Sequence, residues 1–180
     1  MMQKNFIIFT LFILIVNLPA VISAKVDPPN YDFSLDALAV FKPDQDLETI
    51  KKKYPGGEEI SSQGSVSVWR FYVAHIRYKF PVWVQLKNGK VLDSFATLPS
   101  YFLHDVFHQS IINRYGKQDS YYKKEENAVY SWEKKTDIKM VYSGSCTITC
   151  FPLYFSMIIK SPPTDMENYK PLIVQFDSKI

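Results

Sequence analysis

Apolar and polar residues alternate along residues 65–98, with the period of a β-strand that buries one face. The runs SVSVWRFYV, IRYKFPVWVQL and KVLDSFATL are rich in β-branched and aromatic residues. Asn88 and Gly89 stand between the last two runs and form the commonest two-residue hairpin turn signal. We therefore predict a meander of three or four antiparallel strands.

A helical pattern, KPDQDLETIKKKYPGG, precedes these strands. Leu47, Ile50 and Tyr54 recur at helical spacing, and Pro43 with the acidic residues after it suits a first turn. The Pro-Gly-Gly of residues 55–57 is a stop signal. The pattern predicts a short helix that begins at Pro43 and ends before this stop.

The same order of patterns then returns. The stretch LPSYFLHDVFHQSIINRYGK has one apolar face, with Ser100 as the N-cap and Gly116 as the C-cap of a second helix. A polar loop, KQDSYYKKEEN, leads into three strand-like runs, AVYSWEK, DIKMVYS and CFPLYFSMIIK. Helix and meander thus occur twice, in residues 43–98 and in residues 99–180.

Individual residues of the two halves also correspond. The matched sets are Ile50 and Tyr54 with Ile111 and Tyr115, Trp69 with Trp132, and FPVWV at residues 80–84 with FPLYF at residues 151–155. The second half has extra residues between its Trp and its Phe-Pro phrase, where both cysteines lie. We interpret the pattern as an internal duplication. We predict an α+β fold in which two tandem helix-plus-antiparallel-meander repeats form one curved sheet with the helices on one face.

A short helix ending in Tyr-Gly or Tyr-Pro-Gly is followed by strands with a Trp in the first, and this unit occurs twice. The arrangement resembles the family of the beta-lactamase inhibitory protein. One copy also looks like the small lipoprotein of the outer-membrane barrel assembly machinery. The resemblance covers about residues 44–160 and rests on element order and the phrase RYGK…W. It implies two α/β units joined in a curved antiparallel sheet, in exported proteins that bind other proteins. The chain lacks the acylated Cys of the lipoprotein and the widely spaced cysteines of the inhibitor.

Period-two alternation assigns the side chains of each strand to two faces. The predicted inner residues are Tyr78, Phe80, Val82, Val84 and Leu86 in the first half and Phe151, Leu153, Phe155, Met157 and Ile159 in the second. The predicted outer residues are Arg77, Lys79, Pro81, Trp83 and Gln85, and Pro152, Tyr154 and Ser156. Because proline donates no ladder hydrogen bond, Pro81 and Pro152 are expected at an edge or a bulge.

Each half therefore directs one large aromatic residue away from the core: Trp83 in the first and Tyr154 in the second. With Arg77 and Lys79 beside Trp83, this composition suits protein recognition. We predict these four residues as a partner-binding face. The alternative is that the N-terminal segment covers the aromatic rings, or that the rings stabilise their cross-strand neighbours.

Residues 1–24 have the layout of a secretory signal peptide. MMQKN carries one Lys, FIIFTLFILIV is an apolar run, and NLPAVISA ends in Ser-Ala, so we expect cleavage after Ala24. An uncleaved anchor is the alternative, although the run is shorter than the roughly 20 residues of a spanning helix. We predict a secreted or periplasmic protein with no membrane span after signal removal, in which residues 25–42 form an extended segment.

Charge and composition narrow the class of partner. The chain has 21 Lys and Arg against 18 Asp and Glu, without a long block of either sign, so we do not expect nucleic acid as a partner. Aromatic residues make up 16%, more than a small core needs, so we expect some of them on the surface.

Cys146 and Cys150 form a close pair, which in an exported protein is most simply a disulfide. Residues four apart on one strand are separated by about 13 Å, so a bond requires the chain to fold back at residues 147–149. A redox-active or metal-binding pair is the alternative, although the spacing is not Cys-x-x-Cys.

The string HDVFH places His104 and His108 on one helix face, with Asp105 beside the first, as in His-Glu-x-x-His zinc proteases. The acid is Asp, not Glu, and both histidines flank an apolar stripe where packing histidines are common. No nucleophile elbow or phosphate-binding Gly loop occurs.

We therefore predict an exported protein-binding module without catalytic activity and without a cofactor. The alternatives are a metal-dependent hydrolase that uses His104, Asp105 and His108, and a carrier of an apolar ligand held between the sheet and the helices.

Overall fold

The structure is a computed structural model and describes residues 35–75, 78–99, 104–134, 136–146, 150–166 and 168–177. The predicted signal peptide, residues 1–24, lies outside the described residues, as does the segment up to residue 34. No helix in the described part of the chain is both long and apolar enough to cross a membrane.

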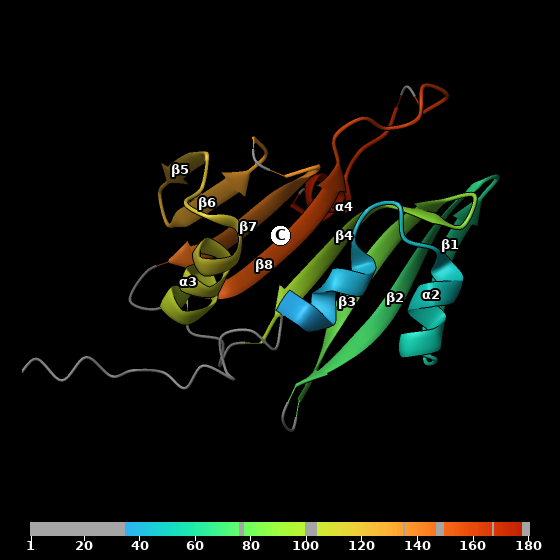
Figure 1. Ribbon diagram of the computed structural model, residues 1–180, viewed down its shortest axis with the longest axis horizontal. Helices are drawn as coiled ribbons and strands as arrows, with labels where there is room; N and C mark the ends of the chain where they lie inside the picture. Colours follow the sequence, from blue (N-terminus) through green and yellow to red (C-terminus); the bar gives the residue numbers. More distant parts are fainter. Residues whose placement is uncertain are drawn as a thin grey trace, which may run out of the picture.

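Eight strands form one antiparallel sheet (Figure 1), so the predicted α+β class is confirmed. The strands are β1 (Glu58–Gln63), β2 (Val66–His75), β3 (Tyr78–Lys87), β4 (Lys90–Leu98), β5 (Ser120–Lys124), β6 (Asn127–Trp132), β7 (Ile138–Cys146) and β8 (Cys150–Ile159). Their spatial order is β1-β2-β3-β4-β8-β7-β6-β5. Two four-stranded meanders are therefore joined where β4 pairs with β8.

The β3–β4 hairpin turns at the predicted dipeptide. Asn88 and Gly89 have φ values of 50° and 75°, the left-handed conformation that a two-residue turn requires. The face assignment also holds on β3, where Phe80, Val82 and Val84 are buried while Lys79 is exposed.

The helix α2 (Leu47–Lys53) is present but begins later than predicted. Asp44 has φ 70°, which no helix accommodates, and its backbone N–H donates to the carbonyl of Val91 at 2.9 Å. Asp46 forms an isolated β-bridge with Lys90. Residues 44–46 therefore bond to the start of β4, and the helix starts only after them.

The second helix, α3 (His104–Tyr115), ends where predicted. Gly116 has φ 82° and its N–H donates to the carbonyl of Ile112 at 2.8 Å, which makes it the C-cap. Ser100, the predicted N-cap, lies outside the described residues.

Residues 35–41 were predicted as part of an extended segment but are helical. Residues 35–38 form one turn that continues into the 3₁₀ helix η1 (Ala39–Phe41). The physical reason is burial: Leu38 and Phe41 enter the core, and the ring of Phe41 stacks on Tyr54 at 5.2 Å.

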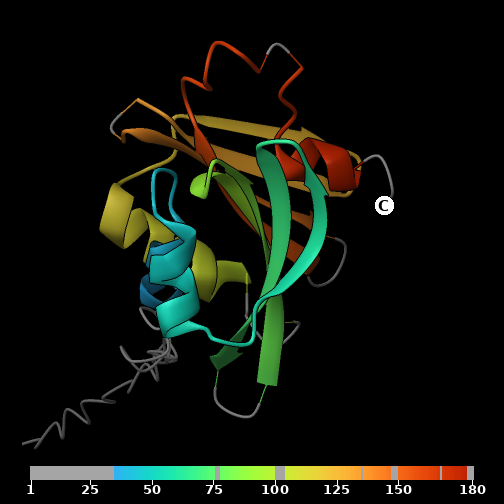
Figure 2. The same ribbon diagram turned by 90° about the vertical axis from the view of Figure 1, so that its right-hand side faces the viewer.

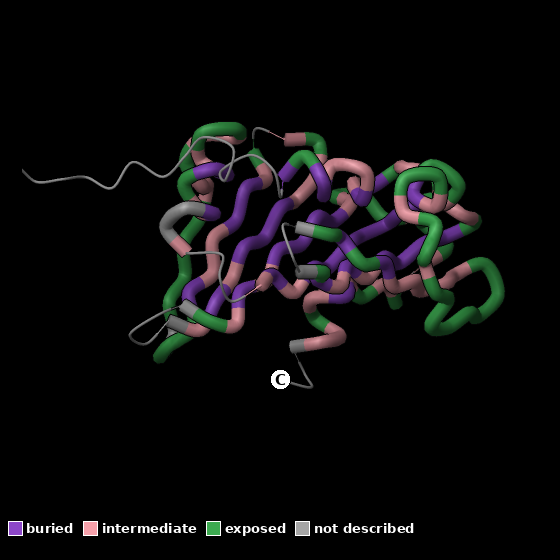
Figure 3. Tube along the Cα trace, turned by 90° about the horizontal axis from the view of Figure 1, so that it is seen from below, coloured by how far each residue is buried: buried purple, intermediate pink, exposed green. Residues whose placement is uncertain are grey.

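The inner face of the sheet, defined by Phe80, Val82 and Val84 of β3 and Leu153 and Phe155 of β8, carries the hydrophobic core. Helices α2 and α3 and the N-terminal helical turn cover this face (Figure 2). Buried residues run through the middle of the strands, and exposed residues gather at the ends and in the connections (Figure 3).

One helix lies on the opposite, outer face, so the prediction that all helices share one face is wrong. Helix α4 (Leu172–Asp177) packs its Phe176 ring on Trp83 and Phe95, which belong to the outer face. Figure 2 shows α4 across the sheet from α2 and α3.

The two Phe-Pro phrases do not occupy corresponding strands. The phrase at residues 80–84 lies in β3, the third strand of its meander, and the phrase at residues 151–155 lies in β8, the fourth. Pro152 lies beside the β7–β8 register shift, as expected. Pro81 pairs with Tyr72 in an interior strand, one residue beyond Val82, where the β3–β4 pairing ends.

Candidate functional site

A row of aromatic rings crosses the outer face where the two meanders join. Trp83 of β3 lies 5.9 Å from Phe95 of β4, and Phe95 stacks on Tyr154 of β8 at 5.3 Å, measured between ring centroids. The β4–β8 pairing thus brings the two predicted aromatic residues to one surface. The sequence pattern did not single out Phe95, because its position between Trp83 and Tyr154 depends on which strands pair.

Helix α4 covers one end of this row. The Phe176 ring lies 5.2 Å from Trp83 and 5.0 Å from Phe95, and Trp83 is half-buried as a result. The cover anticipated for these rings was the N-terminal segment, but it is the C-terminal helix that supplies it.

The other end of the row opens into a groove of about 780 Å³ on the outer face of the second meander. Its floor includes Val141 and Ser143 of β7 and Tyr154 and Ile158 of β8. We call this the outer-face groove.

The two walls of the groove come from different elements on the outer face. Tyr122 of β5 and Val129 of β6 form one wall, and Ile173 and Val174 of α4 form the other. Tyr122 is 60% exposed and Val174 is 54% exposed, so both rims present apolar surface to solvent.

The strand register sets the distance from Tyr122 at the rim to Tyr154 in the floor of the groove. Tyr154, Ser143, Val129 and Tyr122 are direct cross-strand neighbours on β8, β7, β6 and β5. Three strand spacings separate the two tyrosines, which corresponds to about 14 Å.

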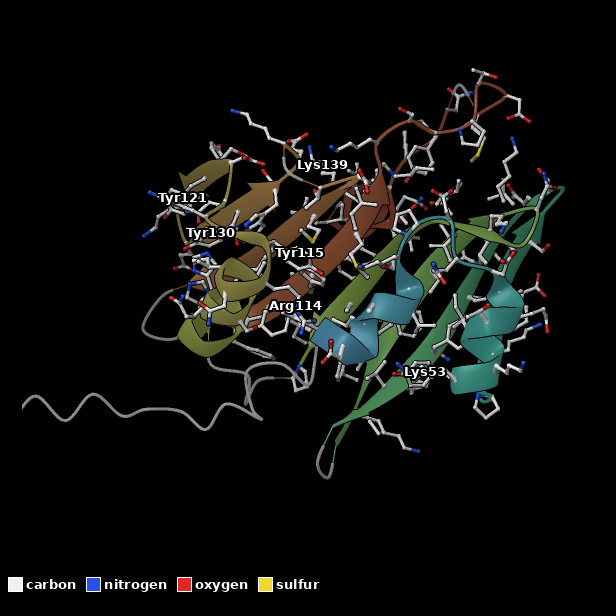
Figure 4. All side chains as sticks on the ribbon, viewed as in Figure 1. Lys53, Arg114, Tyr115, Tyr121, Tyr130 and Lys139 are labelled. Carbon is white, nitrogen blue, oxygen red and sulfur yellow. The ribbon has the colours of Figure 1, made fainter. Side chains whose placement is uncertain are left out.

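Its length follows from β7. Lys139, Val141, Ser143 and Ser145 alternate along this strand and line the groove, a distance of about 20 Å for six residue steps. Lys139, at one end (Figure 4), is the one charged side chain among the described lining residues, and it pairs with Glu133 at 3.3 Å. The groove is therefore long and chiefly apolar.

A buried carboxyl group lies under the start of α4. Asp93 is 1% exposed, and its two oxygens accept hydrogen bonds of 2.8 Å from the Leu172 N–H and the Tyr169 hydroxyl. Burial raises the pKa of Asp93 to about 7, although both hydrogen bonds oppose the rise. Burial, with the nearby Asp93 charge, also raises the pKa of Tyr169.

The remaining predicted site residues are dispersed. Lys79 is exposed on β3, four residues before Trp83, and Arg77 lies outside the described residues. Cys146 and Cys150 are paired in the antiparallel β7–β8 register. Residues 147–149, where the chain was predicted to fold back, lie outside the described residues. The two cysteine side chains lie outside the described part of the structure, and the disulfide stays a prediction.

The two histidines of α3 do lie on one helix face, within an aromatic cluster. Their rings are 5.4 Å apart, His104 Nδ1 is 3.0 Å from the Tyr142 hydroxyl, and the His108 ring is 4.2 Å from Tyr130. Tyr130 also contacts exposed Tyr121 at 4.9 Å (Figure 4). Among the described residues no group of three or more His, Cys, Asp or Glu is placed to hold a metal ion. The Asp105 side chain lies outside the described part of the structure.

No protein-family model, no curated protein and no solved structure matches this chain.

Proposed function

We propose that this chain is an exported, noncatalytic protein-binding module whose outer-face groove binds an extended apolar segment of a partner protein. The observation that carries the proposal is the open groove between Tyr122 and Val174, with Tyr154 in its floor. A monomeric protein seldom exposes apolar side chains in a connected row unless they contact a partner.

The dimensions favour an extended peptide. About 20 Å along β7 accommodates six residues in strand conformation, and alternate side chains of such a segment would point into the groove. Tyr154 offers one ring in the floor of the groove and Tyr122 another at its rim, and tyrosine is among the residues that most often dominate interface energies.

We further propose that the two halves, α2 with β1–β4 and α3 with β5–β8, are related repeats. Support comes from the shared element order and from Trp69 in β2 and Trp132 in β6, the second strand of each meander. The resemblance to the beta-lactamase inhibitory protein and to the barrel-assembly lipoprotein favours the same class of function, an exported protein that binds other proteins.

The experiment is a selection of peptides from a random display library on the purified chain, followed by NMR titration of the recovered peptide. We expect the largest shifts along β7 and at Tyr122 and Tyr154. Tyr154→Ala should weaken binding at least tenfold, which is about 1.4 kcal/mol.

Tyr72→Ala is the matched control, because Tyr72 is a 41% exposed tyrosine on β2, outside the groove. The affinity of the Tyr72→Ala variant for the selected peptide should stay within about twofold of wild type. Equal losses in both variants, or shifts confined to other surfaces, would refute the groove as the binding site.

A carrier of a small apolar ligand is the second candidate, favoured by one observation. The groove volume of about 780 Å³ lies within the range of small-molecule sites. Native mass spectrometry of the purified chain separates the two: an apolar molecule that copurifies and is lost in Tyr154→Ala supports the carrier.

A further inference from the structure

The chain after β8 forms a strap over the outer face. We call residues 161–166 and 168–177 the C-terminal strap; in Figures 1 and 2 its first part leaves β8 and runs away from the sheet, and its second part returns as α4. Lys87 and Asp165 form an ion pair near its start, and Phe176 rests on Trp83 and Phe95 near its end.

Between these points the strap is held by Asp93. The Tyr169 hydroxyl and the Leu172 N–H donate to its two oxygens, and the Gln85 amide lies 3.1 Å from Oδ2. Helix α4 has six residues, too few to be stable alone, so its structure depends on being docked.

Resting on the proposed function, we propose that the strap is a removable cover over the aromatic end of the binding surface, held by Asp93 more tightly in acid than at neutral pH. When α4 is docked, Phe176 occupies the place over Trp83 and Phe95 that a partner's apolar side chain would take. When α4 leaves, the surface extends from Tyr154 to Trp83.

The sign of the pH dependence follows from burial. A docked strap seals the Asp93 carboxyl away from water, which favours its protonated form, whereas the undocked carboxyl is solvated and ionises near its ordinary pKa of 3.8. Docking is therefore strongest below the ordinary pKa and weakens as pH rises toward 7. Between pH 5 and pH 7 the docking constant should fall by a factor of roughly 10 to 100.

The other groups around the strap do not supply this dependence. Tyr169 has a raised pKa and stays protonated in this range. Lys87 holds the pKa of Asp165 below its usual range, so that carboxylate stays charged. Gln85, Gln175 and the Lys170 backbone, which also lie at this contact, do not titrate.

The test is hydrogen exchange of the full chain, measured by NMR at the Leu172 amide and at amides in the middle of β3, and corrected for intrinsic rates. Leu172 should lose protection by 10- to 100-fold from pH 5 to pH 7, with no matching loss in β3. In Asp93→Asn the protection of Leu172 should be flat with pH, since the amide does not ionise and its one oxygen still accepts from the Leu172 N–H.

Asp165→Asn is the matched control: it removes the ion pair with Lys87 and should lower protection at every pH while leaving the slope intact. Flat protection in wild type, the same slope in Asp93→Asn, or equal protection at Leu172 and in β3 would overturn the removable cover.

A second measurement links the cover to binding. Phe176→Ala should raise the affinity for the selected peptide severalfold at pH 5 if the Phe176 ring competes with the peptide. Unchanged affinity, with Tyr154→Ala still weakening the peptide, overturns the cover and leaves the groove standing. If instead no peptide binds the groove, the proposed function fails, while the exchange data still report on the strap.

Discussion

At the scale of single residues, two neighbouring glycines differ in what they do. A Cβ on Gly57 would lie 2.0 Å from Cε1 of Phe71, a ring buried in the core, whereas a Cβ on Gly56 would meet nothing within 4 Å. The Pro-Gly-Gly pattern predicted a helix stop, but it could not distinguish these two roles. Phe71 lies in β2, and its contact with residue 57 depends on the tertiary structure.

We therefore predict that Gly57→Ala destabilises the fold by about 1–3 kcal/mol, because the new methyl group displaces the Phe71 ring. Gly56→Ala should be neutral or slightly stabilising, since it only restricts the unfolded chain. Urea unfolding of both variants measures the difference. Equal effects would show that the Phe71 contact does not constrain residue 57.

At the scale of elements, the hydrophobic pattern did not predict the two edge strands, β1 and β5. All six residues of β1 are exposed, and β5 lies within the run KQDSYYKKEEN that was predicted as a loop. An edge strand with polar side chains has no apolar alternation, so only its pairing with β2 or β6 makes it a strand. Charged residues on such edges also oppose pairing between molecules.

Lys123 on β5 provides the test at this scale. We predict that Lys123→Ile promotes concentration-dependent self-association, since it makes the exposed edge more apolar beside Tyr121 and Tyr122. Lys117→Ile, in the exposed connection before β5, is the control, and it should self-associate less than Lys123→Ile. Light scattering over a concentration series measures both. Similar association of the two variants would mean that apolar character alone, and not the edge, is responsible.

At the scale of the whole molecule, the β4–β8 pairing makes one sheet of two meanders. Leu98 and Leu153 are paired across this joint and both are buried in the core. One core extends over both meanders, from Phe71 in β2 to Trp132 in β6. We expect the two halves to unfold together.

Leu153→Ala should lower stability by about 2–5 kcal/mol through the cavity it leaves. The NMR indole signals of Trp69, in the first half, and Trp132, in the second, should report the same shifted midpoint in urea. Ile60→Ala on β1, a 48% exposed position, should change stability by less than about 0.5 kcal/mol. Separate midpoints for the two indoles would show that the halves unfold independently.

Several features of the fold depend only on neighbouring residues, and the amino-acid pattern was enough to predict them. The Asn88-Gly89 turn, the Gly116 cap and the faces of β3 follow from local dihedral preferences and from the pleat, which any pairing partner preserves. The same reasoning placed Trp83 and Tyr154 on the outer face, and both lie there.

The contacts between segments that are distant along the chain depend on the tertiary structure. Phe95 connects the two predicted rings because β4 pairs with β8, and Phe176 covers one of them because Asp93 bonds the start of α4. The groove likewise exists only because five strands, β4 to β8, and one helix, α4, meet. None of these contacts leaves a local pattern, since their energy comes from surfaces that are far apart along the chain.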